Sequence, residues 1–281
     1  MARYFLKPIN LRQVAQKYGL KVDFDATVLG VSDSNVGASD TITDYIKGDL
    51  PAKGTILITK KAIEGYRCVL SDNPSEDFYC LINEFSKSIG FTPLYNSKVH
   101  ESVIIGQNVV IEKGVEIGQN TTIEHNVVIH SGTSIGANCI IRSGAVIGGE
   151  GYGFVIDSEQ RYLRQPFVGG VVIREEVEVG YNSAIVRGSI NNTILGTGVK
   201  LDNLVHIAHD CVIGDYSTVT AGVTFCGYVV VGKNVRFAPQ STVKQRIHIG
   251  DNAIVGLGAV VVKNIVAGDV VVGNPAKPLI K

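Results

Sequence analysis

The chain has 281 residues, 26 Lys and Arg against 26 Asp and Glu, and 45% hydrophobic residues. A formal net charge of zero argues against a broad surface for nucleic acid or anionic membrane. The beginning of the chain, MARYFLKPINLRQVAQKYG, is too polar for a signal peptide, and no stretch reaches the roughly 18 apolar residues of a membrane span. We therefore expect a cytoplasmic protein with no nucleic-acid partner and no membrane insertion.

The cysteines argue against a secreted or zinc-stabilised fold. They form no CxxC pair and are widely spaced, at Cys68, Cys80, Cys139, Cys211 and Cys226. We expect small buried hydrophobic side chains in a reducing compartment, and neither a disulfide framework nor a zinc site.

Residues 1–95 predict a small α/β domain. LRQVAQKYG is expected to form a short helix that ends at Gly19, and TILITKKAI and CVLSDN have the composition of strands. PSEDFYCLINEFSKSIG has apolar residues at helical spacing, with Pro74 at its start and Gly90 after its end. The segment FTPLYNSK then leads into residues 96–281.

In residues 96–281 an apolar residue recurs at every sixth position. Steps of six from Ile105 meet only isoleucine as far as Ile147, and steps from Leu195 meet only apolar residues as far as Val261. An α-helix is excluded, because a step of six spreads residues around its axis. The period predicts a solenoid with three short parallel strands in each coil. Glycine often follows the apolar residue, as at Gly118, and we expect a turn with positive φ there.

The six-residue repeat breaks in two places. Residues 148–172 carry no repeat and are predicted to form an excursion loop. A shorter slip occurs at Arg187–Thr193, where Ile185 and Leu195 are ten residues apart. Loops on a rigid scaffold often carry binding groups, although a packing arm against a neighbouring subunit is an equal alternative.

Histidines are the candidates for acid–base chemistry. His125 and His209 both lie two residues after an inward-facing isoleucine, at or near a corner, and spacing alone does not distinguish them. An N-acyl transfer needs a base for the amine proton and a backbone N–H for the thioester oxygen, and a histidine beside a glycine corner offers both. Asp202 or Asp210 could orient the imidazole. The histidines are clustered too closely or spread too widely for a three-histidine metal site, so we expect no metal.

Two stretches resemble the family of UDP-3-O-acylglucosamine N-acyltransferases of lipid A synthesis. VIGGEGYGFVIDSEQRYLRQPFVGGVVI is similar to the family's excursion loop, and RGSINNTILGTGVKLDNLVHIAHDCVIGDYSTVTAGVTFCG is similar to its catalytic coils. The resemblance implies a mainly β protein, a left-handed parallel β-helix with a small N-terminal α/β domain. It places His209 on the catalytic base and Gly227 on the glycine whose N–H holds the oxyanion.

The resemblance also suggests further site residues. Asp202 would act with His209 in catalysis, and residues 1–95 are a candidate for contact with the nucleotide sugar. Four residues are expected to bind substrate, namely Asn203, His206, Tyr152 and Phe154. Lys277, in GNPAK, is expected to meet a phosphate of CoA.

Three departures from the family bear on the acyl donor. Gln245 and Arg246 stand near the place of a second family histidine, and the strand GTILIT lacks the family's aromatic residue. The ending GNPAKPL resembles CoA-dependent sugar acetyltransferases and not the helices linked to acyl-carrier-protein binding. We therefore expect transfer of a short acyl group, most simply from acetyl-CoA, to the amine of a nucleotide-linked amino sugar.

Two alternatives remain. One is the UDP-3-O-(3-hydroxyacyl)glucosamine N-acyltransferase of lipid A synthesis, with acyl-carrier protein as the donor. The other is a non-catalytic β-helix scaffold, since a fold does not fix a function. The enzyme readings imply a homotrimer with sites between neighbouring prisms and no permanently bound cofactor.

Overall fold

The computed structural model describes residues 2–17, 20–22, 24–32, 37–44, 49–88, 96–156 and 159–278. The expected helix ends at Gly19 and Gly90, and the link at residues 91–95, lie outside these ranges. Two compact units are formed, one from Met1–Pro93 with Tyr152–Val168 and the other from Leu94–Gly151 with Gly169–Lys281. No helix in the described ranges is long and apolar enough to cross a membrane.

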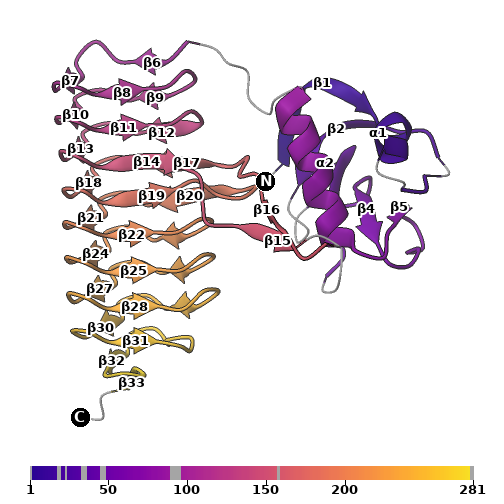
Figure 1. Ribbon diagram of the computed structural model, residues 1–281. Helices are drawn as coiled ribbons and strands as arrows, with labels where there is room; N and C mark the ends of the chain where they lie inside the picture. The colour runs from indigo at the N-terminus through magenta and orange to yellow at the C-terminus, as the bar shows by residue number, and fades with distance from the viewer. Residues whose placement is uncertain are drawn as a thin grey trace. The chain divides into compact units, whose positions relative to one another are not determined.

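The first unit contains a five-stranded sheet and two helices (Figure 1). Its strands, in sheet order, are β1 (Ala2–Asn10), β2 (Thr27–Ser32), β3 (Thr41–Asp44), β4 (Ile56–Thr59) and β5 (Arg67–Leu70). Only β1 and β2 pair antiparallel. The strands predicted in TILITKKAI and CVLSDN are therefore observed as β4 and β5.

The two helices are α1 (Leu11–Lys17) and α2 (Pro74–Ser88), as the sequence predicts. Helix α2 packs on β3 and β4 because Phe78, Leu81 and Ile82 recur at helical spacing and are fully buried. A hairpin of β15 (Phe154–Ile156) and β16 (Tyr162–Arg164), from the excursion, belongs to the same unit, and β15 contacts α2.

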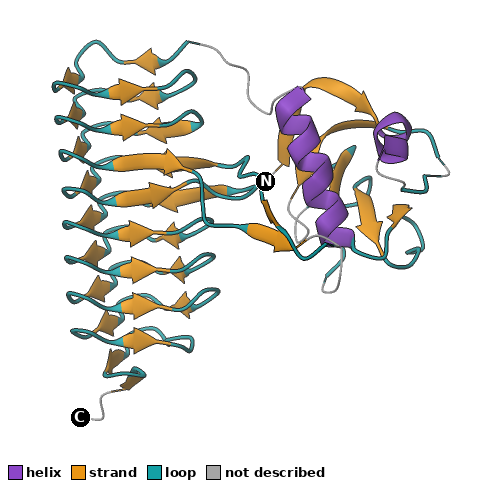
Figure 2. Cartoon of the chain, in the orientation of Figure 1, coloured by secondary structure: helices purple, strands orange, loops and turns teal. Residues whose placement is uncertain are grey.

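The second unit is a left-handed parallel β-helix with three flat faces (Figures 1 and 2). The first face contains β7 (Ile104–Ile105), β10 (Thr122–Ile123), β13 (Ile140–Ile141), β18 (Glu178–Val179), β21 (Lys200–Leu201), β24 (Thr218–Val219), β27 (Arg236–Phe237), β30 (Ile254–Val255), β32 (Val270–Val272) and β33 (Lys277–Pro278). The second face contains β8 (Val110–Ile111), β11 (Val128–Ile129), β14 (Val146–Gly149), β19 (Ala184–Val186), β22 (His206–Ile207), β25 (Thr224–Phe225), β28 (Thr242–Val243) and β31 (Val260–Val261). The third face contains β6 (Lys98–Val99), β9 (Glu116–Ile117), β12 (Thr133–Ile135), β17 (Gly170–Ile173), β20 (Asn192–Leu195), β23 (Val212–Ile213), β26 (Val230–Val231) and β29 (His248–Ile249).

The repeat fills the interior of this prism. Residues at the same repeat position pair across coils, as Ile123 does with Ile141 and Phe225 with Val243. These side chains are fully buried and belong to one continuous cluster along the axis. Each coil therefore rests on its two neighbours, as the six-residue period predicts.

The glycines that follow the inward residues act differently from our expectation. Gly118 and most of its equivalents do not have positive φ, and Gly148 is the exception among them. A Cβ on Gly118 would lie 2.7 Å from the backbone of Gly136 in the next coil. These positions need glycine because adjacent coils approach closely. The left-handed conformation occurs two residues later, as at Asn120 and Asn138.

Three corners join the faces, and we number them in chain order. The first corner leads from the first face to the second, the second corner from the second face to the third, and the third corner back to the first. Both breaks in the repeat occur at the second corner: the excursion leaves between β14 and β17, and the slip lies between β19 and β20.

Candidate active site

His209 lies at the second corner, between β22 and β23. Its Nδ1 is 2.9 Å from Oδ2 of Asp210. The imidazole is 24% exposed and the carboxyl of Asp210 only 4% exposed. A buried carboxylate thus faces one ring nitrogen, while the ring itself remains accessible. This is the arrangement in which Nδ1 carries a proton and Nε2 can act as a base.

The Asp210 carboxylate is held by the slip in the repeat. Its Oδ2 accepts hydrogen bonds from the backbone N–H and the hydroxyl of Ser189, at 3.0 and 2.7 Å. The backbone N–H of Asp210 donates to the hydroxyl of Thr193 at 2.9 Å. Sequence spacing did not identify Ser189 or Thr193, because the slip removes them from the repeat.

Gly227 lies against His209 in the next coil. A Cβ on Gly227 would be 2.6 Å from Cε1 and 2.7 Å from Nε2 of His209, so only glycine leaves room for the ring. Tyr228 packs edge-on against the imidazole, with ring centroids 5.1 Å apart, and the guanidinium of Arg246 lies 4.3 Å from the Tyr228 ring centre. The predicted pair of His209 and Gly227 is therefore brought together by the fold.

His206 is next to this site, on β22 of the second face. Burial lowers its pKa below the ordinary value for histidine, and the nearby His209 lowers it further. His206 is thus held neutral beside the candidate base.

The carboxylate beside His209 is Asp210, which the sequence left open as one of two choices; Asp202 is not in contact with it. Asp202 and Asn203 lie at the first corner, where Oδ1 of Asp202 accepts the backbone N–H of Asn203 at 2.8 Å. Oδ1 of Asn203 in turn accepts the backbone N–H of Tyr181 at 2.9 Å. Both residues line a cavity of about 430 Å³ beside the first face. Within one chain, the predicted residues Asn203 and His209 therefore lie at two different corners.

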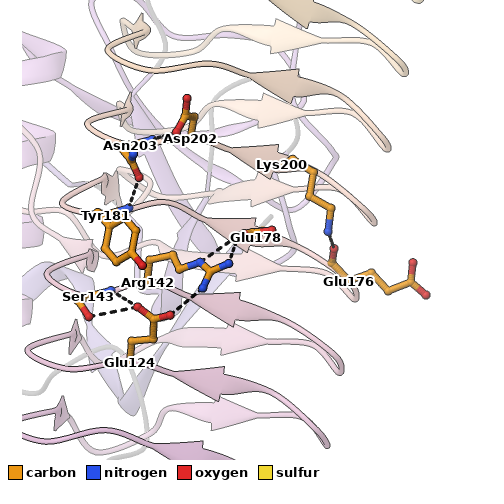
Figure 3. A network of polar contacts seen from close by, with 9 residues as sticks. All are labelled: Glu124, Arg142, Ser143, Glu176, Glu178, Tyr181, Lys200, Asp202 and Asn203. Carbon is orange, nitrogen blue, oxygen red and sulfur yellow. Dashed lines mark hydrogen bonds and ion pairs between the residues drawn. The ribbon is translucent and has the colours of Figure 1, made fainter.

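An ion network forms one wall of this cavity (Figure 3). Arg142 bridges Glu124 at 2.8 Å and Glu178 at 2.6 Å. Partial burial opposes ionisation of Glu124, but hydrogen bonds from Arg142 and Ser143 outweigh it and hold the Glu124 pKa below its usual range. The amine of Lys200 donates to the carbonyl of Glu176. The wall presents fixed charges of both signs, as a polar ligand requires.

The repeats match a known protein-family model. The bacterial transferase hexapeptide (six repeats) model fits residues 96–131, 114–149 and 192–227. These segments of the chain are similar to bacterial transferase hexapeptide repeats. The third matched segment contains both His209 and Gly227.

Curated relatives similar to part of this chain are named UDP-3-O-acylglucosamine N-acyltransferase. The protein of Wolinella succinogenes is 36% identical over 46% of this chain and 40% of its own length. The Caulobacter protein is 38% identical over 41% of this chain and 34% of its own. The chain thus spans well under half the length of these relatives.

Solved structures with a similar fold include LpxA from Acinetobacter baumannii, with a TM-score of 0.60 and 25% identity. The match covers 66% of this chain and 69% of the LpxA chain. The UDP-N-acetylglucosamine acyltransferase of Francisella novicida gives a TM-score of 0.59 and 29% identity, over 67% of this chain and 69% of its own. The left-handed β-helix is shared with both.

The remaining predicted site residues lie elsewhere. Tyr152 and Phe154 belong to the first unit, with ring centroids 5.0 Å apart, and Tyr152 is 90% exposed. Lys277 is exposed on β33. His125 is at the first corner, where its Nδ1 accepts the backbone N–H of Gln107. His125 and His209 share a repeat position but occupy different corners, and this distinguishes them.

Proposed function

We propose that the protein is an N-acyltransferase that acts on a UDP-linked 3-O-acylglucosamine or a closely similar nucleotide sugar. The observation that carries the proposal is the His209–Asp210 pair packed against Gly227. Support for the acceptor comes from the names of the curated relatives. The match to the family model at residues 192–227 includes both His209 and Gly227.

In the proposed reaction, Nε2 of His209 takes the proton from the acceptor amine as its nitrogen attacks the thioester carbon. A C–N bond forms, and negative charge develops on the thioester oxygen. The Gly227 N–H, beside the ring, stabilises that oxygen. Collapse of the intermediate breaks the C–S bond, and His209 returns the proton to the departing thiolate. Asp210 keeps Nδ1 protonated and stabilises the imidazolium in between.

The proposed donor is an acyl chain on acyl-carrier protein, with no permanently bound cofactor. This was the alternative in the sequence reading, which put acetyl-CoA first. The names of the relatives support the lipid A reading better than transfer of an acetyl group. Lys277 is exposed and remains a candidate contact for a donor phosphate, since a phosphopantetheine phosphate is common to acyl-carrier protein and CoA.

We further propose that the working form is a cytoplasmic homotrimer. Asn203 and His209 occupy different corners of one prism, so a site that contains both needs a second copy. Three flat-faced prisms around an axis would bring the first corner of one copy to the second corner of the next. The cavity at Asp202 and Asn203 would then hold the sugar, with Asp202 as a contact of the sugar and not as the partner of His209.

A role for the first unit in holding the nucleotide is a separate part of the proposal. It contains a cavity of about 710 Å³ whose lining includes Arg12, Lys21, Phe24 and Tyr66. Aromatic rings can stack on a base and cationic groups can pair with phosphates. Tyr152 and Phe154 remain candidates for sugar contact.

The test offers the full chain two donors, a 3-hydroxyacyl-carrier protein and acetyl-CoA, with UDP-3-O-acylglucosamine as acceptor. We expect an amide product from the carrier-protein donor and its loss in His209→Gln. Transfer only from acetyl-CoA would reject the proposed donor. If neither donor gives a product with the wild type, and His209→Gln binds the sugar as well as the wild type does, the scaffold alternative is supported.

A further inference from the structure

The geometry points to Ser189 as a positioning residue that fixes His209 through Asp210, and to the slip at residues 187–193 as the segment that delivers it. This inference rests on the proposed function, because it assigns Ser189 a part in the same reaction. The Ser189 hydroxyl donates to Asp210, so its effect on His209 passes through the carboxylate.

Asp210 has few ways to stabilise its charge. Its carboxyl is 4% exposed, and Oδ1 is buried without a hydrogen-bond partner among the described residues. Within the described ranges, the hydrogen bonds to the carboxylate therefore fall on Oδ2, two from Ser189 and one from His209. A buried carboxylate without such donors is costly. Ser189 thus supplies two of the hydrogen bonds that hold this carboxylate facing the ring.

Tyr228 contacts both Ser189 and His209. Its hydroxyl is 3.1 Å from the Ser189 hydroxyl, and its ring packs edge-on against His209. The Ser189 hydroxyl already donates to Asp210, so the tyrosine hydroxyl can donate to it in turn. The chain Tyr228–Ser189–Asp210–His209 then aligns these donors toward the carboxylate, with Nδ1 of His209 as the donor and Nε2 as the nitrogen that accepts a proton in the proposed reaction.

The slip that carries Ser189 is itself held firmly. The backbone N–H of Gly169 donates to the carbonyl oxygens of Gly188 and Ser189, and the N–H of Gly188 donates to Gly170. A Cβ on Gly188 would collide with the Asn191 carbonyl and lie 2.9 Å from Oδ1 of Asp210. A regular coil has no extra residues at this corner. The extra residues of the slip therefore place Ser189 within hydrogen-bond distance of the Asp210 carboxylate.

The first test needs no substrate. In the full chain labelled with ¹⁵N-histidine, and with His209 assigned by comparison with His209→Gln, we expect neutral His209 to carry its proton on Nδ1. In Ser189→Ala the Nε2-protonated form should become clearly populated. A wild-type His209 protonated mainly on Nε2 would overturn the inference. So would an unchanged ratio of the two forms in Ser189→Ala.

The second test is kinetic. We expect Ser189→Ala to lower kcat by about tenfold or more, as for loss of a hydrogen bond to a charged group, with KM for both substrates within about twofold. Ser189→Thr keeps the hydroxyl and should restore most of kcat. Ser241→Ala is the matched control, because Ser241 is equally buried and its hydroxyl has no partner among the described residues.

The outcomes separate the two proposals. If no acyl transfer is found with any donor, the proposed function fails, whereas the proton position on His209 still tests Ser189. If transfer occurs but Ser189→Ala keeps its kcat, or Ser241→Ala loses as much, Ser189 is only a structural residue.

Discussion

The imidazole of His209 occupies the space that a side chain would need at Gly227, one coil further along the β-helix. A Cβ at residue 227 would lie 2.6 Å from Cε1 of the ring, closer than real contacts allow. Because the coils are fixed by the ladder of parallel strands, the two backbones cannot move apart, and only the His209 side chain could shift. The site is therefore set by stacking and not by a flexible loop.

Gly227→Ala should displace the imidazole and lower kcat strongly, by about a hundredfold or more, if the ring position sets proton transfer. The fold should persist, because Gly227 does not have positive φ and the methyl meets a side chain, not backbone. Gly149→Ala is the control, since a Cβ there meets no atom closer than 3.8 Å. Steady-state rates of both variants check this; equal activity would show that the ring position is not critical.

Asp210→Asn should lower kcat by about a hundredfold or more while leaving binding of the acceptor sugar nearly unchanged. The amide is nearly isosteric, but it has no negative charge to stabilise the imidazolium of His209. Asp251→Asn is a suitable control, because Asp251 also accepts a backbone N–H, from Lys233, but at the third corner. A similar loss of kcat in both variants would show that the effect is structural.

Much of this arrangement was predictable from the sequence. The period of six specified the β-helix, the coil spacing and the burial of residues such as Ile123, because one repeat position always faces inward. The pairing of His209 with Gly227 was implied by the family resemblance, and their separation by 18 residues, one full coil, is consistent with it. Ser189 was not predictable, since it lies in the slip, where the repeat position no longer indicates whether a side chain points inward or outward. Likewise, spacing could not distinguish His125 from His209, because the two share a repeat position and only the structure shows which residues surround each of them.

His206 should make the stability of the protein fall in mild acid. Its folded-state pKa is lowered, so as the pH falls the unfolded chain takes up a proton first, near the ordinary histidine pKa of 6.5. The penalty begins as pH falls through that value and is complete below the lower, folded-state pKa. Urea midpoints at pH 7.5 and 5 should differ less in His206→Gln than in the wild type. An equal drop in both proteins would exclude His206 as a cause.

Arg142→Ala should destabilise the β-helix by about 1–3 kcal/mol, because it leaves the half-buried carboxylates of Glu124 and Glu178 without their shared cation. Arg142→Lys should recover only part of this loss, since one ammonium does not reproduce the bidentate geometry. Urea denaturation at neutral pH measures both. If Arg142→Ala were as stable as the wild type, the network would be a solvated surface feature.

The most direct measurement is a single-turnover assay of amide formation from 3-hydroxyacyl-carrier protein and UDP-3-O-acylglucosamine, for wild type and His209→Gln at equal, saturating protein. We predict rapid product formation by the wild type and a loss of at least about a hundredfold in the variant, with an unchanged oligomeric state and circular dichroism spectrum. Equal rates in the two proteins would contradict His209 as the base. The β-helix would stand, but the chemistry proposed for its second corner would not.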